Sequence, residues 1–245
     1  MGPEPGSRAA RSCGAVVDVA RPRAGRRRRA AAAVEHGATA CRPVDRRGGD
    51  VLILVRHGRT AVNAGGRLQG HMDVPLDDTG VAQARAVGEV LRRTFPGARV
   101  ISSPLVRALD TARAIVDEPE IDRRFIELDY GDWDGLRMDE VGDAWRRWRD
   151  DPHLRPPNGE TLVELDDRVR PALLELSGDA RNGDVIVVSH VSPIKSAVTW
   201  ALGAGPELTW RLSLHRASIC TVRIGPNGPV LESFNETGHL EGLGK

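Results

Sequence analysis

Two runs of apolar residues stand out in the chain, VLILV at 51–55 and the apolar part of DVIVVSH at 184–190. Neither run alternates with polar residues, which is typical of a strand that is covered on both faces in a parallel sheet. Further strands are predicted at ARVISS (98–103), around IDRRFIEL (121–128), at SICTVRIG (218–225) and at PVLESF (229–234).

Apolar residues at three- and four-residue spacing predict helices between these strands. The predicted helices cover 79–95, 104–116, 139–149, 160–177 and 192–203. Thr79 is the expected N-cap of the first helix, and Pro104 suits the first turn of the second. Pro171 is expected to kink or split the helix that contains it, because proline removes a backbone hydrogen bond.

Strands that alternate with helices predict an α/β domain with a mostly parallel central sheet and helices on both faces. Residues 50–245 are predicted to form this domain. Residues 1–49 are rich in Arg, Ala, Gly and Pro and hold no aromatic residue, so we predict a disordered basic tail there. No apolar segment follows its basic residues, so a secretory signal is not expected.

The net charge of +1 hides an asymmetry along the chain. Residues 1–49 hold eleven arginines and four acidic residues, a formal charge of +7, so the remainder carries −6. A mildly acidic domain gives no reason to expect a nucleic-acid partner, and no apolar run is long enough to suggest a membrane span. The three cysteines are scattered, which suits a reducing compartment. We expect a cytoplasmic protein with no membrane partner, and a homodimer is left open.

Candidate chemistry gathers where two predicted strands end. VLILVRH ends at His57 and DVIVVSH at His190, with Arg56 and Arg59 beside the first and Arg107 after a third strand. Ligands of open α/β sheets bind just beyond the carboxyl ends of the strands. Cations packed together need an anion between them, and guanidinium groups match the oxygens of phosphate. The pattern therefore predicts a phosphate site.

The RHG triplet at 56–58, within RHGRTAVN, resembles the opening motif of the histidine phosphatase superfamily, which includes cofactor-dependent phosphoglycerate mutases and phosphomonoesterases. Further segments resemble the motifs of this family in order: LQGHMDVPLDDTG, SSPLVRALDTA, IELDYGDWDG, PNGET and VIVVSHVSPIK. A lone RHG is weak, whereas several ordered matches are strong. The resemblance implies a phosphoglycerate mutase-like three-layer sandwich and chemistry without a metal or a cofactor.

The resemblance also implies catalytic roles. His57 would attack phosphorus and become a phosphohistidine, while Arg56 and Arg107 bind the non-bridging oxygens. His190, protonated beside the phosphate, would be a further donor. Glu127 would give a proton to the leaving oxygen and later take one from water. Three nearby carboxylates are alternative acids: Asp129, Asp132 and Asp134.

Five more residues belong to the predicted phosphate-binding set. Asn63 would complete the cradle, Thr60 lies in the same motif, and Gly58 would allow close approach of the backbone. Arg59 would contact the substrate or lie at the pocket rim. Val191 stands where the family usually has glycine; a positive φ would strain it, although its N–H could still contact the phosphate.

The choice between hydrolysis and transfer depends on the segment of about 30 residues between Glu127 and PNGET. Mutases of the family have a longer insertion there, with extra arginines for the substrate carboxylate. The shorter segment favours a phosphomonoesterase acting on a small phosphorylated metabolite. Mutase-type phosphoryl transfer and a catalytically silent phosphate-binding protein are the alternatives. The tryptophans of this segment, Trp133, Trp145 and Trp148, are expected to pack more than to stack on substrate.

Overall fold

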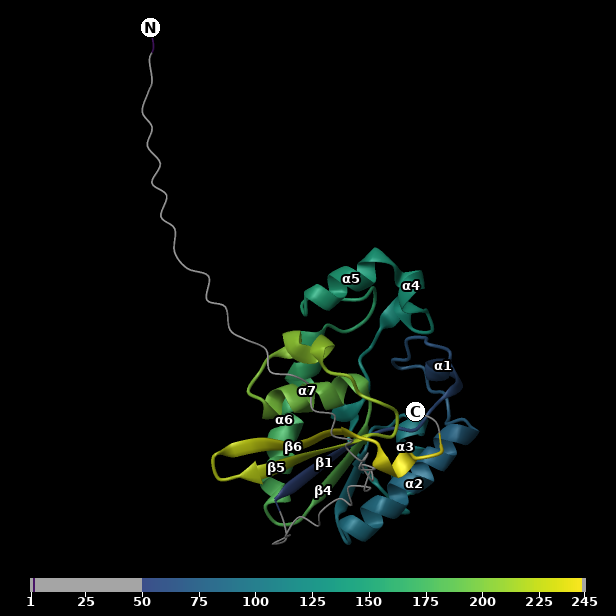
Figure 1. Ribbon diagram of the computed structural model, residues 1–245, viewed down its shortest axis with the longest axis vertical. Helices are drawn as coiled ribbons and strands as arrows, with labels where there is room; N and C mark the ends of the chain where they lie inside the picture. Colours follow the sequence, from purple (N-terminus) through teal and green to yellow (C-terminus); the bar gives the residue numbers. More distant parts are fainter. Residues whose placement is uncertain (1, 3–49, 244–245) are drawn as a thin grey trace, which may run out of the picture. The chain divides into compact units, whose positions relative to one another are not determined.

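The computed structural model describes residue 2 and residues 50–243, so the predicted basic tail at 1–49 lies almost wholly outside the described residues. Within 50–243 the chain forms a six-stranded sheet with the order β3-β2-β4-β1-β5-β6 (Figure 1). The strands are β1 (Val51–Arg56), β2 (Arg99–Ser102), β3 (Glu120–Ile121), β4 (Val185–Ser189), β5 (Ile219–Gly225) and β6 (Gly228–Glu236). The first four are mutually parallel, β5 is antiparallel to β1, and β6 is antiparallel to β5. The predicted, mostly parallel sheet is confirmed.

Helices cover both faces of this sheet. The helices of the described residues are α1 (Ala61–Ala64), α2 (Asp78–Thr94), α3 (Val106–Arg113), α4 (Met138–Val141), α5 (Asp143–Asp150), α6 (Leu162–Ala180) and α7 (Val191–Ala201). Alternate residues of β1 show the layering, since Leu52 and Leu54 pack with α6 and α7, whereas Ile53 and Val55 pack with α2 and α3. The three-layer α/β fold is therefore confirmed. Within 50–243, no helix is both long and apolar enough to cross a bilayer.

Three local expectations differ from the structure. Helix α6 runs continuously through Pro171, so a split there is wrong; proline removes a single hydrogen bond, and the buried face of α6 keeps the helix packed on the core. Helix α2 is capped by Asp77, whose side chain accepts the N–H of Gly80, rather than by Thr79. The strand expected around IDRRFIEL is limited to β3, because a 3₁₀ turn begins at Arg123.

The pairing of β1 with β4 positions the site. The two strands are parallel neighbours, and Arg56 pairs with Ser189 in their register. The N–H of His57 donates to the carbonyl of Ser189 at 3.0 Å. His57 and His190 therefore follow neighbouring strands at the same edge of the sheet, as the strand pattern predicted.

Candidate active site

Two histidine side chains lie together beyond the carboxyl ends of β1 and β4. Both are buried, and their ring centroids are 5.0 Å apart. His57 Nδ1 lies 2.6 Å from the carbonyl oxygen of Gly58. Because a carbonyl only accepts, Nδ1 carries the hydrogen and Nε2 keeps a free lone pair. This is the tautomer that a nucleophilic imidazole needs.

Gly58 holds the loop that follows the nucleophile. A Cβ on Gly58 would lie 2.5 Å from the carbonyl oxygen of Gly80, so a side chain does not fit between this loop and α2. The N–H of Gly58 donates to Thr111 Oγ1 at 3.1 Å. Gly58 thus permits close packing of backbone on backbone, and the packing holds the His57 main chain in place.

Both imidazoles are neutral in the environment that the protein provides. Burial, followed by the charge of Arg107, lowers the pKa of His57 and of His190 well below 6.5. The imidazolium expected at His190 was for a ring beside a phosphate, and it stays a prediction; in the protein alone the charges around this ring are cationic. His190 Nε2 lies 2.7 Å from Ser103 Oγ, and its Nδ1 has no partner among the described residues.

Arg107 is a buried cation and Arg56 is a half-buried one, and both bond to carbonyl groups rather than to carboxylates. Arg107, on α3, donates to the carbonyls of Gly70 and Met72, both at 2.8 Å. Arg56 donates to the carbonyl of Leu214 at 2.6 Å. Burial lowers the pKa of Arg56 to about 10, so its guanidinium stays charged at neutral pH. Neither positive charge is neutralised by an ion pair within the described residues.

Three buried N–H groups and one imidazole nitrogen of the predicted site residues lack a partner in the described part of the chain. The N–H groups are Arg56 Nε, Asn63 Nδ2 and Arg107 Nε, and the imidazole nitrogen is His190 Nδ1. A buried donor left without an acceptor costs about 1–3 kcal/mol, and more when it is charged. Their coincidence with the predicted residues indicates that this region is built for an anion with several oxygens.

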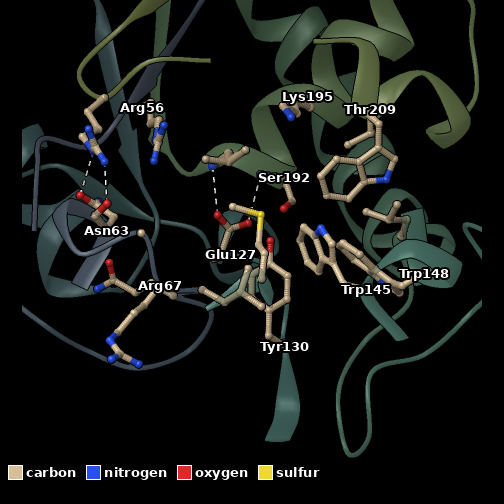
Figure 2. A pocket seen from close by; sticks show the side chains of 18 of the residues that line it. Arg56, Asn63, Arg67, Glu127, Tyr130, Trp145, Trp148, Ser192, Lys195 and Thr209 are labelled. Atoms are coloured by element: carbon tan, nitrogen blue, oxygen red, sulfur yellow. Dashed lines mark hydrogen bonds between the residues drawn. The ribbon is translucent and has the colours of Figure 1, made fainter. Parts of the chain in front are cut away.

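Glu127 is held at the N-terminus of α7. Its Oε1 accepts the N–H groups of Leu128 at 2.8 Å and Ser192 at 3.1 Å, and its Oε2 accepts that of Val191 at 3.0 Å. Dashed lines in Figure 2 mark the bonds from Val191 and Ser192. Oε2 therefore accepts one of these three hydrogen bonds and keeps a lone pair on which a proton can sit.

The alternative acids near Glu127 have structural roles. Asp129 accepts the N–H of Gly131, and Asp132 accepts the side-chain amide of Asn158. Asp134 accepts the N–H groups of Gly70 and Met72. These three carboxylates organise turns and do not line the cavity, whereas Glu127 does.

Val191 differs from its prediction in two ways. It is the first residue of α7 and is absent from the described residues with positive φ, so valine is not strained there. Its N–H donates to Glu127, which corrects the expected main-chain contact with the phosphate. At this position the backbone orients the carboxylate.

The remaining predicted residues organise the site around the RHG loop. Arg59 donates to Asp77 at 2.8 Å and to Thr79 at 2.7 Å and does not line the cavity. Thr60 caps α1 and donates to Gln69. Asn63 Oδ1 accepts from the Thr60 N–H and from Arg216 Nε, so its amide is oriented with Nδ2 unpaired.

A cavity of about 290 Å³ adjoins His57. Predicted residues on its wall are Arg56, His57, Asn63, Glu127 and Val191. Wall residues without a predicted role include Gln69, Tyr130, Lys195, Trp210 and Arg216. Gln69 and Tyr130 lie inside the quoted motifs, so the sequence held a signal for them. Arg216 lies after the 3₁₀ segment Pro206–Arg211 and belongs to none of the quoted motifs. Only the fold brings it next to Asn63.

The three tryptophans of the 128–157 segment are all buried in one core cluster, so the expected packing is confirmed. Trp133 packs edge-on against Trp148 with ring centroids 6.1 Å apart, and Trp145 and Trp148 also line the cavity. Within residues 50–243, no group of three or more His, Cys, Asp or Glu side chains is placed to hold a metal ion.

The lowered histidine pKa values predict acid-sensitive stability. Below pH 6.5 the unfolded chain protonates His57 and His190 while the folded chain does not, so stability is lost as pH falls. The free energy of unfolding should fall by up to about 1.4 kcal/mol per pH unit for each imidazole. Urea unfolding between pH 6.5 and 5.5 measures this slope. His190→Asn should reduce the slope, and His153→Asn, at an exposed position, should not; equal slopes in all three proteins would contradict the assignment.

The family model of the histidine phosphatase superfamily (branch 1) matches residues 52–237. The chain therefore belongs to the histidine phosphatase superfamily, as its ordered motifs predicted. Phosphatases that act on small phosphorylated metabolites are among its relatives.

Several of the individual relatives are named phosphatases. Phosphoserine phosphatase 1 of Hydrogenobacter thermophilus is 32% identical over 198 residues, which cover 77% of this chain and 93% of that protein. Glucosyl-3-phosphoglycerate phosphatase of Mycolicibacterium vanbaalenii is 40% identical over 174 residues, 65% of this chain and 76% of that protein. The bifunctional protein Rv2228c of Mycobacterium tuberculosis is 35% identical over 198 residues. The chain spans only 54% of the length of that relative.

Solved structures of similar proteins have the same fold. The H9A mutant of phosphoserine phosphatase from Entamoeba histolytica, in complex with phosphoserine, has a TM-score of 0.72 and 31% identity, covering 78% of this chain and 98% of that chain. Mycobacterial glucosyl-3-phosphoglycerate phosphatase in complex with VO3 has a TM-score of 0.69 and 30% identity, and the match covers 77% of this chain and 100% of that chain.

Proposed function

We propose that the chain is a phosphomonoester hydrolase that acts on a small phosphorylated metabolite through a phosphohistidine on His57. The observation that carries the proposal is the free Nε2 of a neutral, buried His57 among buried donors without acceptors. The named activities of the relatives support it, since two of them are phosphatases of small phosphorylated metabolites.

In the first step, His57 Nε2 attacks phosphorus and the bond to the leaving oxygen breaks. The unpaired N–H groups of Arg56, Arg107 and Asn63 would take the non-bridging oxygens. A bound dianion would raise the pKa of His190 and favour its imidazolium as a further donor. The proton for the leaving oxygen would come from Oε2 of Glu127, the oxygen with a free lone pair.

In the second step, water attacks phosphorus and the bond to His57 Nε2 breaks. Glu127 would take a proton from this water, which regenerates the protonated carboxyl and releases inorganic phosphate. The main-chain donors of Leu128, Val191 and Ser192 keep the carboxylate in position for both transfers.

The 128–157 segment supports hydrolysis over mutase-type transfer. None of the arginines in this segment lines the cavity: Arg137, Arg146, Arg147, Arg149 and Arg155. The residues of this segment that do reach the wall are Tyr130, Met138, Trp145 and Trp148. No cationic clamp from this segment would then hold a phosphoglycerate for return of the phosphoryl group.

Phosphate release from a panel of small phosphorylated metabolites and from an aryl phosphate tests the proposal. With 3-phosphoglycerate, free phosphate is expected and the isomeric phosphoglycerate is not. A ³²P-labelled substrate quenched in alkali should leave label on the peptide that contains His57. Isomer without net phosphate release would favour the mutase, and binding of inorganic phosphate without turnover would favour the silent protein.

The proposed chemistry also predicts insensitivity to chelators. Arginine and histidine N–H groups supply the charge stabilisation that a metal ion would otherwise give, so dialysis against EDTA should leave kcat unchanged within about twofold. The measurement is the rate of aryl phosphate hydrolysis before and after dialysis, with magnesium or zinc added back. A rate that disappears and returns with the metal would overturn the mechanism.

A further inference from the structure

Lys195 is a buried cation that the proposed hydrolysis does not use. It lies on α7, four residues after Val191, and lines the same cavity as His57. The residue is 7% exposed, and no described residue forms a hydrogen bond or an ion pair with its ammonium group. A buried charge without a partner is costly, so its presence on a cavity wall indicates a ligand group that pairs with it.

One aromatic ring lies beside this ammonium group, and two more rings pack against that ring. Lys195 Nζ lies 5.4 Å from the ring centroid of Trp210, and the rings of Trp145 and Trp148 lie 5.3 and 5.1 Å from that of Trp210. Trp148 and Trp210 each carry a buried Nε1–H without an acceptor among the described residues. Lys195 and these three tryptophans are called the tryptophan subsite below.

The tryptophan subsite is separate from the phosphate-binding groups. In Figure 2, Arg56 and Asn63 lie on one side of Glu127, while Lys195, Trp145 and Trp148 lie on the other. Glu127, which transfers the proton to the leaving oxygen in the proposed mechanism, is thus between them. A substrate with its phosphoryl group at His57 would extend its alcohol part past Glu127 into the tryptophan subsite.

The charges near Lys195 do not neutralise it. Burial lowers its pKa to about 8; Glu127 acts in the opposite direction, and Arg56 adds to the lowering. The Glu127 carboxylate already accepts three backbone hydrogen bonds and forms no ion pair with Lys195. At neutral pH the ammonium group therefore remains mostly charged and available to a ligand.

We propose that Lys195 binds a carboxylate on the alcohol part of the substrate, and that the tryptophan subsite holds the apolar body that carries this carboxylate. The inference rests on the proposed function of the same cavity. The ammonium group matches the single negative charge of a carboxylate, and the rings of the tryptophan subsite match an apolar body. A second phosphate would call for the several cations found at the His57 end. Lys195 is thus a specificity-determining residue for carboxylated phosphomonoesters.

Matched aryl phosphates test this proposal. 3-Carboxyphenyl phosphate and 3-carbamoylphenyl phosphate have nearly the same shape and differ by one negative charge. The wild-type kcat/KM for the carboxylate is expected to exceed that for the amide by about tenfold to a hundredfold. Lys195→Met should bring this ratio close to one, and Lys195→Arg should restore part of it.

The control is Arg146→Met, which removes one positive charge from an exposed side chain on α5 and should keep the wild-type ratio. If thermal melting shows that Lys195→Met does not fold, the kcat/KM ratios of the wild type and of Lys195→Arg test the proposal instead. The same ratio is measured as dissociation constants with the two non-hydrolysable aryl phosphonates. Discrimination that depends on Lys195 without turnover would support the subsite and overturn the hydrolase. Turnover of both esters at equal rates, with equal phosphonate affinities, would overturn the subsite alone.

Discussion

Replacement of His57 by alanine is expected to lower kcat/KM for an aryl phosphate by about 10⁴-fold or more, since it removes the atom that forms the covalent intermediate. The other groups that hold the phosphoryl oxygens remain, so the variant should still bind inorganic phosphate. Stopped-assay phosphate release measures the loss, and calorimetry measures the binding.

Two comparisons make the His57→Ala result specific. His153→Ala changes an exposed histidine and should keep the wild-type rate. Alkali-stable ³²P labelling should disappear in His57→Ala together with turnover. A His57→Ala protein that retains more than about 1% of the wild-type rate would exclude the phosphohistidine route.

Glu127→Gln is expected to have the second largest effect, with a size that depends on the leaving group. For an alkyl phosphate, whose leaving oxygen needs a proton, kcat/KM should fall by about 10²- to 10⁴-fold. For 4-nitrophenyl phosphate, whose leaving group departs without one, formation of the phosphohistidine should continue. Its hydrolysis should then slow, because no carboxylate accepts the proton of the attacking water. A burst of nitrophenolate followed by a slow steady state is the expected trace.

Substitution at Glu127 also has a structural cost that must be controlled. The glutamine amide can accept the N–H groups of Leu128 and Ser192, but its NH₂ group would face the N–H of Val191, which costs about 1–3 kcal/mol. Urea unfolding separates this loss from catalysis. Asp132→Asn, in the same loop but off the cavity, should keep near-wild-type kinetics. An equal loss for both kinds of ester would show that Glu127 is not the proton donor.

The sequence predicted the parts of the site that lie directly at the ends of the buried strands. His57, His190 and Arg56 could be placed together because buried parallel strands end at one edge of a sheet, and motif order added Arg107 and Glu127. Arg216 and Trp210 come from the distant connection before β5, and no local pattern signals where such a segment returns. The role of Lys195 could not be predicted either, because the absence, among the described residues, of a hydrogen bond or ion pair to its ammonium group depends on side chains from other parts of the chain.

Protonation and hydrogen-bond partners were harder to predict than positions. The neutral state of His190 follows from its burial and from the summed charge of Arg107 and Arg56. A one-dimensional motif does not encode that sum. Likewise, the sequence left the N–H of Val191 available to a phosphate, whereas in the fold this N–H donates to Glu127. The fold class, in contrast, depends on the periodicity of long segments and was predicted well.

The close packing of Gly58 on Gly80 has a consequence for how this chain tolerates mutation. A Cβ on Gly80 would lie 2.0 Å from the carbonyl oxygen of Arg59, so even alanine there would push the nucleophile loop away from α2. In a saturation-mutagenesis screen scored by turnover, Gly80 should therefore be as intolerant as a reacting residue although it has no side chain. Loss of activity on substitution of Gly80 would then show that His57 must be held in position by this packing, and not that Gly80 takes part in the reaction.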